Sequence, residues 1–66
     1  MNAIQHLREK LNLTQTEFGK KIGVSRPMIF RYENGWNNPS ISVANRIIKL
    51  ADKYGLKLTL SMIILE

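Results

Sequence analysis

A chain of 66 residues has room for one domain with a small core, and the absence of cysteine excludes disulfides and thiolate metal sites. One histidine and five scattered acidic residues supply no metal-ligand cluster, so we expect no metal and no cofactor. Ten lysines and arginines give a net charge of +5, which favours a polyanionic partner. Because no run of 18 apolar residues and no signal-peptide pattern is present, we expect a cytoplasmic protein that makes no membrane contact.

The first third of the sequence predicts two short helices. Over residues 2–11, apolar residues recur at helical spacing: Ile4, Leu7 and Leu11. Thr14 followed three residues later by Glu17 is a capping box, which predicts that a second helix covers residues 15–22. Gly23 then follows, and a glycine in the left-handed conformation is a common end of a helix.

Two further helices are predicted over residues 26–34 and 41–54. Ser25 and Ser40 precede them and can cap their first turns. Pro27 is tolerated in a first turn, where its missing N–H has no helical partner to lose. Along the longer helix, six residues have the spacing of a buried face: Val43, Ala44, Ile47, Leu50, Ala51 and Tyr54.

The sequence pattern changes from helical to alternating after residue 55. Four apolar residues there alternate with polar ones: Leu56, Leu58, Leu60 and Met62. This period of two predicts a β-strand over residues 56–65. Because no second strand pattern exists to complete a ladder, we expect the strand to pair with the same strand of a second copy. Docking of the strand on its own helices is the alternative. The predicted fold class is therefore mostly α, with one C-terminal strand.

The helix predicted over residues 26–34 has two different faces. Ile29 and Tyr32 point inward, and Met28 lies at the boundary. Four residues point outward: Arg26, Pro27, Phe30 and Arg31. Arginine is the side chain that pairs bidentately with guanine, so two outward arginines are typical of a DNA-reading helix. We expect Trp36, just beyond this helix, to pack over the third and fourth helices; the DNA backbone or a protein partner is the alternative.

The spacing of ten residues resembles the motif of the Cro/phage-repressor-type helix-turn-helix (XRE) family: Gln15, Phe18, Gly19, Gly23, Val24, Ser25, Ile29, Tyr32, Glu33 and Gly35. The resemblance covers roughly residues 4–54. It implies a lambda-repressor-like bundle of four or five helices, in which the second helix of the motif enters the DNA major groove. Gly19 stands where the family more often has alanine, and Pro27 and Phe30 occupy outward positions that are usually polar.

The resemblance also implies which residues contact double-stranded DNA. Arg26 and Arg31 would read bases, and Gln15 would contact a phosphate. The other candidates lie around the third helix and in the loop after it: Ser25, Pro27, Met28, Phe30, Asn34, Asn37 and Asn38. Arg8 and Glu33 match positions where the family often places an ion pair between the first helix and the third.

These expectations predict a DNA-binding transcriptional regulator and not an enzyme, because no nucleophile–base pair or phosphate-binding glycine loop is present. A phage- or prophage-type repressor would bind a palindromic operator as a homodimer, since one recognition helix reads only a few base pairs. The dimer contact would be made by residues of the strand: Leu56, Leu58, Thr59, Leu60, Met62 and Ile64. A C-terminal strand that joins two bundles is similar to the arrangement in Cro proteins and HipB-type antitoxins. The alternative is therefore an antitoxin that binds a toxin and represses its own operon. For either function we expect a location in the bacterial cell with the nucleoid.

Overall fold

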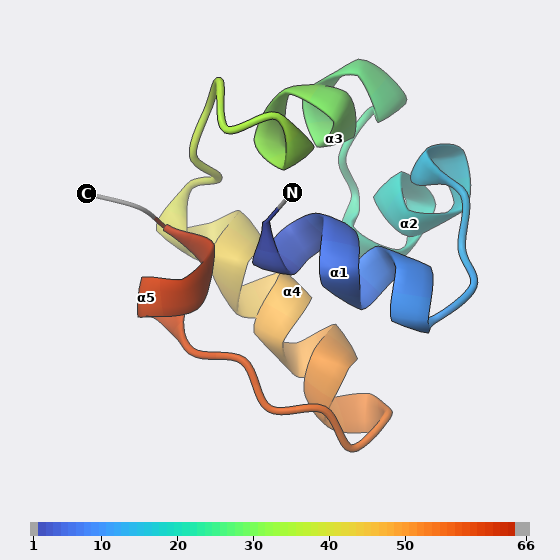
Figure 1. The fold of residues 1–66 in the computed structure, drawn as a ribbon, viewed down its shortest axis with the longest axis vertical. Coiled ribbons are helices and arrows are strands. Elements are labelled where there is room, and N and C mark those ends of the chain that lie inside the picture. Colours follow the sequence, from blue (N-terminus) through green and yellow to red (C-terminus); the bar gives the residue numbers. More distant parts are fainter. Residues whose placement is uncertain (1, 65–66) are drawn as a thin grey trace.

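Five helices form the secondary structure of residues 2–64, the part of the chain that the computed structural model describes (Figure 1). In chain order they are α1 (Ala3–Lys10), α2 (Gln15–Ile22), α3 (Arg26–Glu33), α4 (Ile41–Lys53) and α5 (Leu60–Ile63). The first four confirm the helices expected from the sequence. Each expected boundary lies within one residue of the observed one, because four residues expected inside helices cap them instead: Asn2, Leu11, Asn34 and Tyr54.

Local hydrogen bonds explain why the helices begin where they do. The backbone N–H of Glu17 donates to Thr14 Oγ1 at 3.1 Å, and the backbone N–H of Thr14 donates to Glu17 Oε1 at 2.9 Å, so the predicted capping box is present. Hydrogen bonds from the backbone N–H and the side chain of Thr14 hold the pKa of the exposed Glu17 carboxyl below its usual value. Ser40 caps α4 by accepting from the N–H of Val43. Ser25 precedes α3 without a side-chain cap bond, so α3 depends more on its tertiary contacts.

The core is built from apolar side chains that all five helices contribute. Ten of them are buried: Ile4, Leu7, Phe18, Ile22, Ile29, Tyr32, Ala44, Ile47, Ala51 and Ile63. Helix α2 contacts both α3 and α4, α1 contacts α3, and α5 contacts α1 and α4. Tyr54 was expected on the buried face but is 49% exposed, because α4 ends at Lys53 and Tyr54 only caps it.

The turn between α2 and α3 is closed by backbone atoms in close contact. The N–H of Val24 donates to the carbonyl oxygen of Gly19 at 2.8 Å, and Gly23 between them has a φ of +73°. A Cβ atom on Gly19 would lie 2.2 Å from the carbonyl oxygen of Val24. The turn therefore requires a residue without a side chain at position 19. Arg46 of α4 adds a further cap, since its Nη1 donates to the carbonyl oxygen of Ile22 at 3.1 Å.

The predicted C-terminal strand is wrong as far as residue 64. Residues 56–59 form a connection without regular secondary structure, and the next four residues form the single helical turn of α5. Three apolar residues of this segment lie on or in the helical core: Leu56, Leu58 and Ile63. Leu56 and Leu58 therefore alternate because the chain covers its own bundle, whereas Leu60 and Met62 of the same pattern are exposed. The last expected strand residue, Leu65, lies outside the described residues.

Replacing Gly19 with alanine is expected to destabilise the fold. The new methyl group would collide with the Val24 carbonyl, and overpacking of this kind costs about 1–3 kcal/mol. Urea unfolding followed by circular dichroism measures the loss. The matched control is Lys20→Ala on the exposed face of the same helix, which should change the free energy of unfolding by less than about 0.5 kcal/mol. Equal stabilities for the two variants would contradict the close approach.

Candidate nucleic-acid interface

Helix α3 buries one face and exposes the other. Ile29 and Tyr32 lie in the core, and Met28 is half-buried at the boundary. The exposed face carries the four residues that helical spacing placed outward: Arg26, Pro27, Phe30 and Arg31. In Figure 1 α3 lies at the top of the molecule, with α1 and α4 below it and α5 lower on the left. Nothing in residues 2–64 covers this exposed face.

In the stretch of chain that contains α3, the cationic side chains are exposed and the one carboxylate is buried. Between Ser25 and Ala51 the sequence has one acidic residue, Glu33, and its side chain is buried and ion-paired. The same stretch has four cationic residues: Arg26, Arg31, Arg46 and Lys49. This part of the chain therefore presents a positive surface, of the kind that attracts a polyanion.

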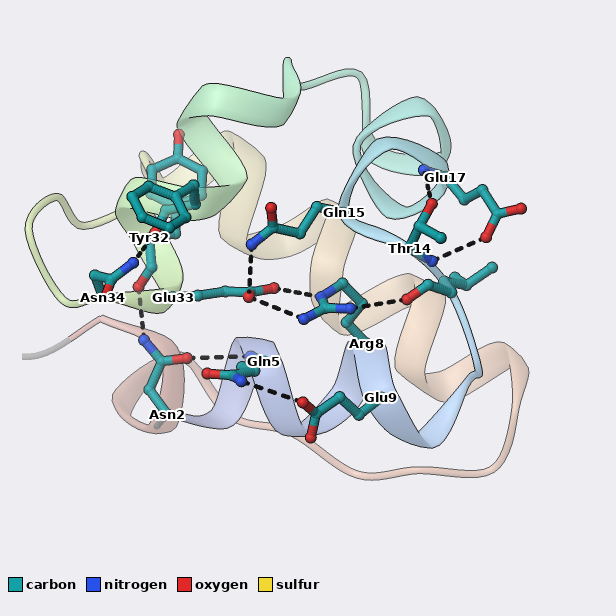
Figure 2. Close-up of polar contacts among 12 residues, drawn as sticks. Asn2, Gln5, Arg8, Glu9, Thr14, Gln15, Glu17, Tyr32, Glu33 and Asn34 are labelled. Carbon is teal, nitrogen blue, oxygen red and sulfur yellow. Dashed lines mark hydrogen bonds and ion pairs between the residues drawn. The ribbon is translucent and has the colours of Figure 1, made fainter.

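The buried side chain of Glu33 joins three helices (Figure 2). Glu33 Oε2 accepts from Arg8 Nε of α1 at 2.6 Å, and Glu33 Oε1 accepts from Arg8 Nη2 at 3.1 Å. The third guanidinium nitrogen, Nη1, donates to the carbonyl oxygen of Leu13 at 2.9 Å. The side chains of Arg8 and Glu33 are only 14% and 4% exposed. Hydrogen bonding to Glu33 raises the pKa of Arg8 above its usual value, so the guanidinium remains charged.

Gln15, the expected phosphate contact, also reaches this acid. Its Nε2 donates to Glu33 Oε1 at 3.1 Å, which ties the first turn of α2 to the last turn of α3. An amide nitrogen carries two hydrogens, so one donor of Gln15 is not used by this bond. Asn2 makes a comparable tie, because its Nδ2 donates to the carbonyl oxygen of Tyr32 at 2.6 Å. The orientation of α3 is thus set by polar contacts from α1 and α2 together.

The loop after α3 brings several of the candidate residues together. Arg31 Nε donates to Asn37 Oδ1 at 2.8 Å, so the expected base reader and an expected backbone contact hold each other. Asn34 Nδ2 donates to the carbonyl oxygen of Phe30 at 2.8 Å. Asn38 is exposed in the same loop. These amides lie beside the exposed face of α3 and extend it beyond the helix.

Trp36 contacts the third helix through Phe30, but it is not packed over the third and fourth helices as expected. Its side chain is 63% exposed, and its ring meets the ring of Phe30 edge to face, with centroids 5.5 Å apart. Sequence reasoning missed this pair because Trp36 lies in a loop, where no period indicates direction. The signal was Phe30, an outward aromatic residue one turn before the loop, next to which a second aromatic could pack.

The six residues expected to form a dimer contact differ in their exposure. Leu56, Leu58 and Ile64 are half-buried against the chain's own core, whereas Thr59, Leu60 and Met62 are exposed. An open groove of about 610 Å³ separates α1 from this segment, and four of its lining residues are large and apolar: Leu7, Leu56, Leu58 and Met62. Exposed apolar side chains beside an open apolar groove form a surface on which another molecule could dock.

Comparison with known proteins identifies the family. The helix-turn-helix family model matches residues 4–61, which includes all of α2 and α3 and the turn that Gly19 closes. The chain belongs to the XRE-type helix-turn-helix family. It is therefore a member of a family of DNA-binding transcriptional regulators. Within the motif, α3 is the recognition helix and α2 is the helix that supports it.

Three relatives in archaea are similar to this helix-turn-helix protein. An uncharacterised HTH-type transcriptional regulator of Methanocaldococcus jannaschii is 39% identical over 57 residues, which cover 86% of this chain and 82% of the relative. One of Archaeoglobus fulgidus is 40% identical over 71% of this chain and 66% of its own length. An HTH-type transcriptional regulatory protein of Pyrococcus furiosus is 40% identical over 76% of this chain, which corresponds to 16% of that larger protein. No solved structure matches the chain.

Residues 2–64 of this helix-turn-helix protein contain neither a membrane-spanning helix nor a metal-ligand cluster. None of the helices there is long and apolar enough to cross a membrane. No group of three or more histidine, aspartate or glutamate side chains comes together there that could hold a metal ion.

Breaking the ion pair between Arg8 and Glu33 is expected to destabilise the domain strongly. Glu33→Met leaves the Arg8 charge buried without its partner, which costs about 3–5 kcal/mol, and Arg8→Met leaves Glu33 in the same position. The double variant Arg8→Met/Glu33→Met should lose much less than the two single losses added together. Urea unfolding of all four proteins gives the coupling free energy. Strictly additive losses would show that the two side chains contribute independently.

Proposed function

We propose that this chain is a sequence-specific regulator that binds double-stranded DNA with α3 in the major groove. One observation carries the proposal: α3 exposes two arginines on its outer face, and its one acidic residue, Glu33, is buried and ion-paired. A rigid, positively charged helix of this kind suits the major groove, which admits an α-helix and displays base edges.

The residues of this face would divide between reading bases and holding the backbone. Arg26 in the first turn and Arg31 five residues later would pair with guanine edges. Pro27 and Phe30 would lie against thymine methyl groups or sugars, with Met28 at the margin. Gln15 would donate its second amide hydrogen to a phosphate. Further backbone contacts would come from four polar residues that flank the helix: Ser25, Asn34, Asn37 and Asn38.

Two copies would act together on a palindromic operator. Eight residues of α3 reach only a few base pairs, whereas a two-fold dimer places two recognition helices in successive major grooves. The exposed Leu60 and Met62 of α5, 38% and 48% exposed, beside the apolar groove along α1, would supply a self-complementary contact without a strand ladder. Bound to a promoter, such a dimer would repress transcription by excluding RNA polymerase.

An antitoxin that binds a toxin and represses its own operon is the alternative, because it uses the same DNA-binding frame. The names of the relatives support regulation of transcription, which both functions include. The neighbouring genes separate the two. A toxin-like reading frame whose product co-purifies with this chain would favour the antitoxin, and a divergent regulator gene would favour the phage- or prophage-type repressor.

Alanine at either arginine is expected to relax sequence discrimination. Sites selected from a random DNA pool define the operator, and Arg26→Ala and Arg31→Ala should each lose about 1–3 kcal/mol of preference for it over random duplex. Fluorescence anisotropy of labelled duplexes measures both affinities. Lys53→Ala, an exposed cation at the far end of α4, is the control and should keep the full preference. Unchanged discrimination in both arginine variants would exclude this face as the reading surface.

A charge placed on the exposed face of α5 is expected to abolish the dimer. Leu60→Lys or Met62→Lys puts a desolvated cation opposite its own symmetry mate, which a two-fold contact cannot accommodate. Sedimentation equilibrium of the parent should give twice the chain mass, and that of either variant the mass of one chain. Ile41→Lys changes another exposed apolar residue and should leave the dimer intact. A parent that remains monomeric with and without operator DNA would refute the dimer.

A further inference from the structure

Trp36 and Phe30 form an aromatic pair on the surface beside the recognition helix. Trp36 is the most exposed of the large apolar side chains in residues 2–64, and the planes of the two rings meet at 87°. Edge-to-face contact is a favourable geometry for aromatic rings, so the indole has a preferred position although most of it faces solvent. An exposed aromatic side chain held in place in this way is typical of a contact surface.

Three hydrogen bonds tie the loop that carries Trp36 to α3. The N–H of Trp36 donates to the carbonyl oxygen of Arg31 at 3.0 Å, and the N–H of Gly35 donates to that of Tyr32 at 3.1 Å. The side chain of Arg31 holds Asn37 on the other side of the tryptophan. Because the loop is already ordered, a partner that binds the indole pays little conformational entropy for fixing it.

The positive charge around the indole favours a polyanionic partner and disfavours a protein partner with basic groups. Arg31, whose carbonyl oxygen accepts from the N–H of Trp36, is exposed, and the neighbouring carboxylate, Glu33, is buried and paired. A duplex backbone offers what this surface lacks, because it joins apolar deoxyribose faces to phosphate oxygens. The indole matches both parts, with an apolar ring and an N–H donor.

We propose that Trp36, held against Phe30, packs on the sugar–phosphate backbone of the bound duplex beside the base pairs that α3 reads. The contact falls on the backbone because the N-terminal part of a recognition helix reaches the base edges, whereas Trp36 lies beyond the C-terminal end of α3. Trp36 therefore adds affinity without adding sequence discrimination. This inference rests on the proposed function and names a contact that helix-turn-helix membership does not assign.

The tryptophan itself reports the contact, because the chain has only one. Titration with the selected operator duplex, and with an unselected duplex of equal length, should change its emission and protect it from quenching by acrylamide. Trp36→Ala should weaken binding of both duplexes by the same factor, about tenfold. Trp36→Phe keeps a ring against Phe30 but loses the N–H donor, and should lose about threefold on both duplexes. Tyr54→Ala removes a similarly exposed aromatic at the far end of α4 and should bind like the parent.

The outcomes separate this inference from the proposed function. No binding of labelled duplex by the parent would overturn both. Binding with unchanged tryptophan emission and parental affinity in Trp36→Ala would overturn the backbone contact alone. A loss confined to the operator would assign Trp36 to base reading and would also overturn it. A change of emission with protein concentration in the absence of DNA would place Trp36 in a contact between copies instead. Circular dichroism confirms that each variant is folded, which is expected for substitutions at exposed positions.

Discussion

The orientation of the recognition helix depends on one buried carboxylate. Glu33 at the end of α3 accepts two hydrogen bonds from Arg8 of α1 and one from Gln15 of α2. A charge so deeply buried is tolerable only when its partners satisfy it, which makes the arrangement of the three helices all-or-none. The same contact removes the nearest negative charge from the surface of α3. One ion pair thus fixes the helix in place and leaves Arg26 and Arg31 as the only charged side chains on its outer face.

A helix as short as α3 is not stable by itself. It has eight residues, no side-chain cap bond from Ser25 and only marginal intrinsic helicity. Helix α3 is stabilised by the packing of Ile29 and Tyr32 in the core and by the ion pair of Glu33. Hydrogen bonds from the following loop, at Trp36 and Asn37, stabilise it further. The side chains available to DNA are therefore presented by a helix whose other side is fully used for packing.

The four longer helices could be predicted to within one residue because their signals are local. The Thr14–Glu17 capping box and the glycine at position 23 act within one turn of the chain. The strand could not be judged in this way. An alternating pattern fits any extended chain with one side against apolar residues, and here that side is the protein's own core. Trp36 and Tyr54 were misplaced for a related reason, since both follow the end of a helix, where periodicity no longer specifies direction.

The glycine at position 19 affects how the protein and a bound duplex would adjust to each other. Because the carbonyl of Val24 occupies the space of a side chain there, the angle between α2 and α3 is set by main-chain contact and has no soft side chain to absorb a change. Helices α2 and α3 therefore cannot change their relative angle to fit an imperfect half-site. If α3 binds the major groove as proposed, any mismatch in groove width or curvature must be absorbed by the duplex, and the bending stiffness of base pairs that the protein never touches would become part of its selectivity.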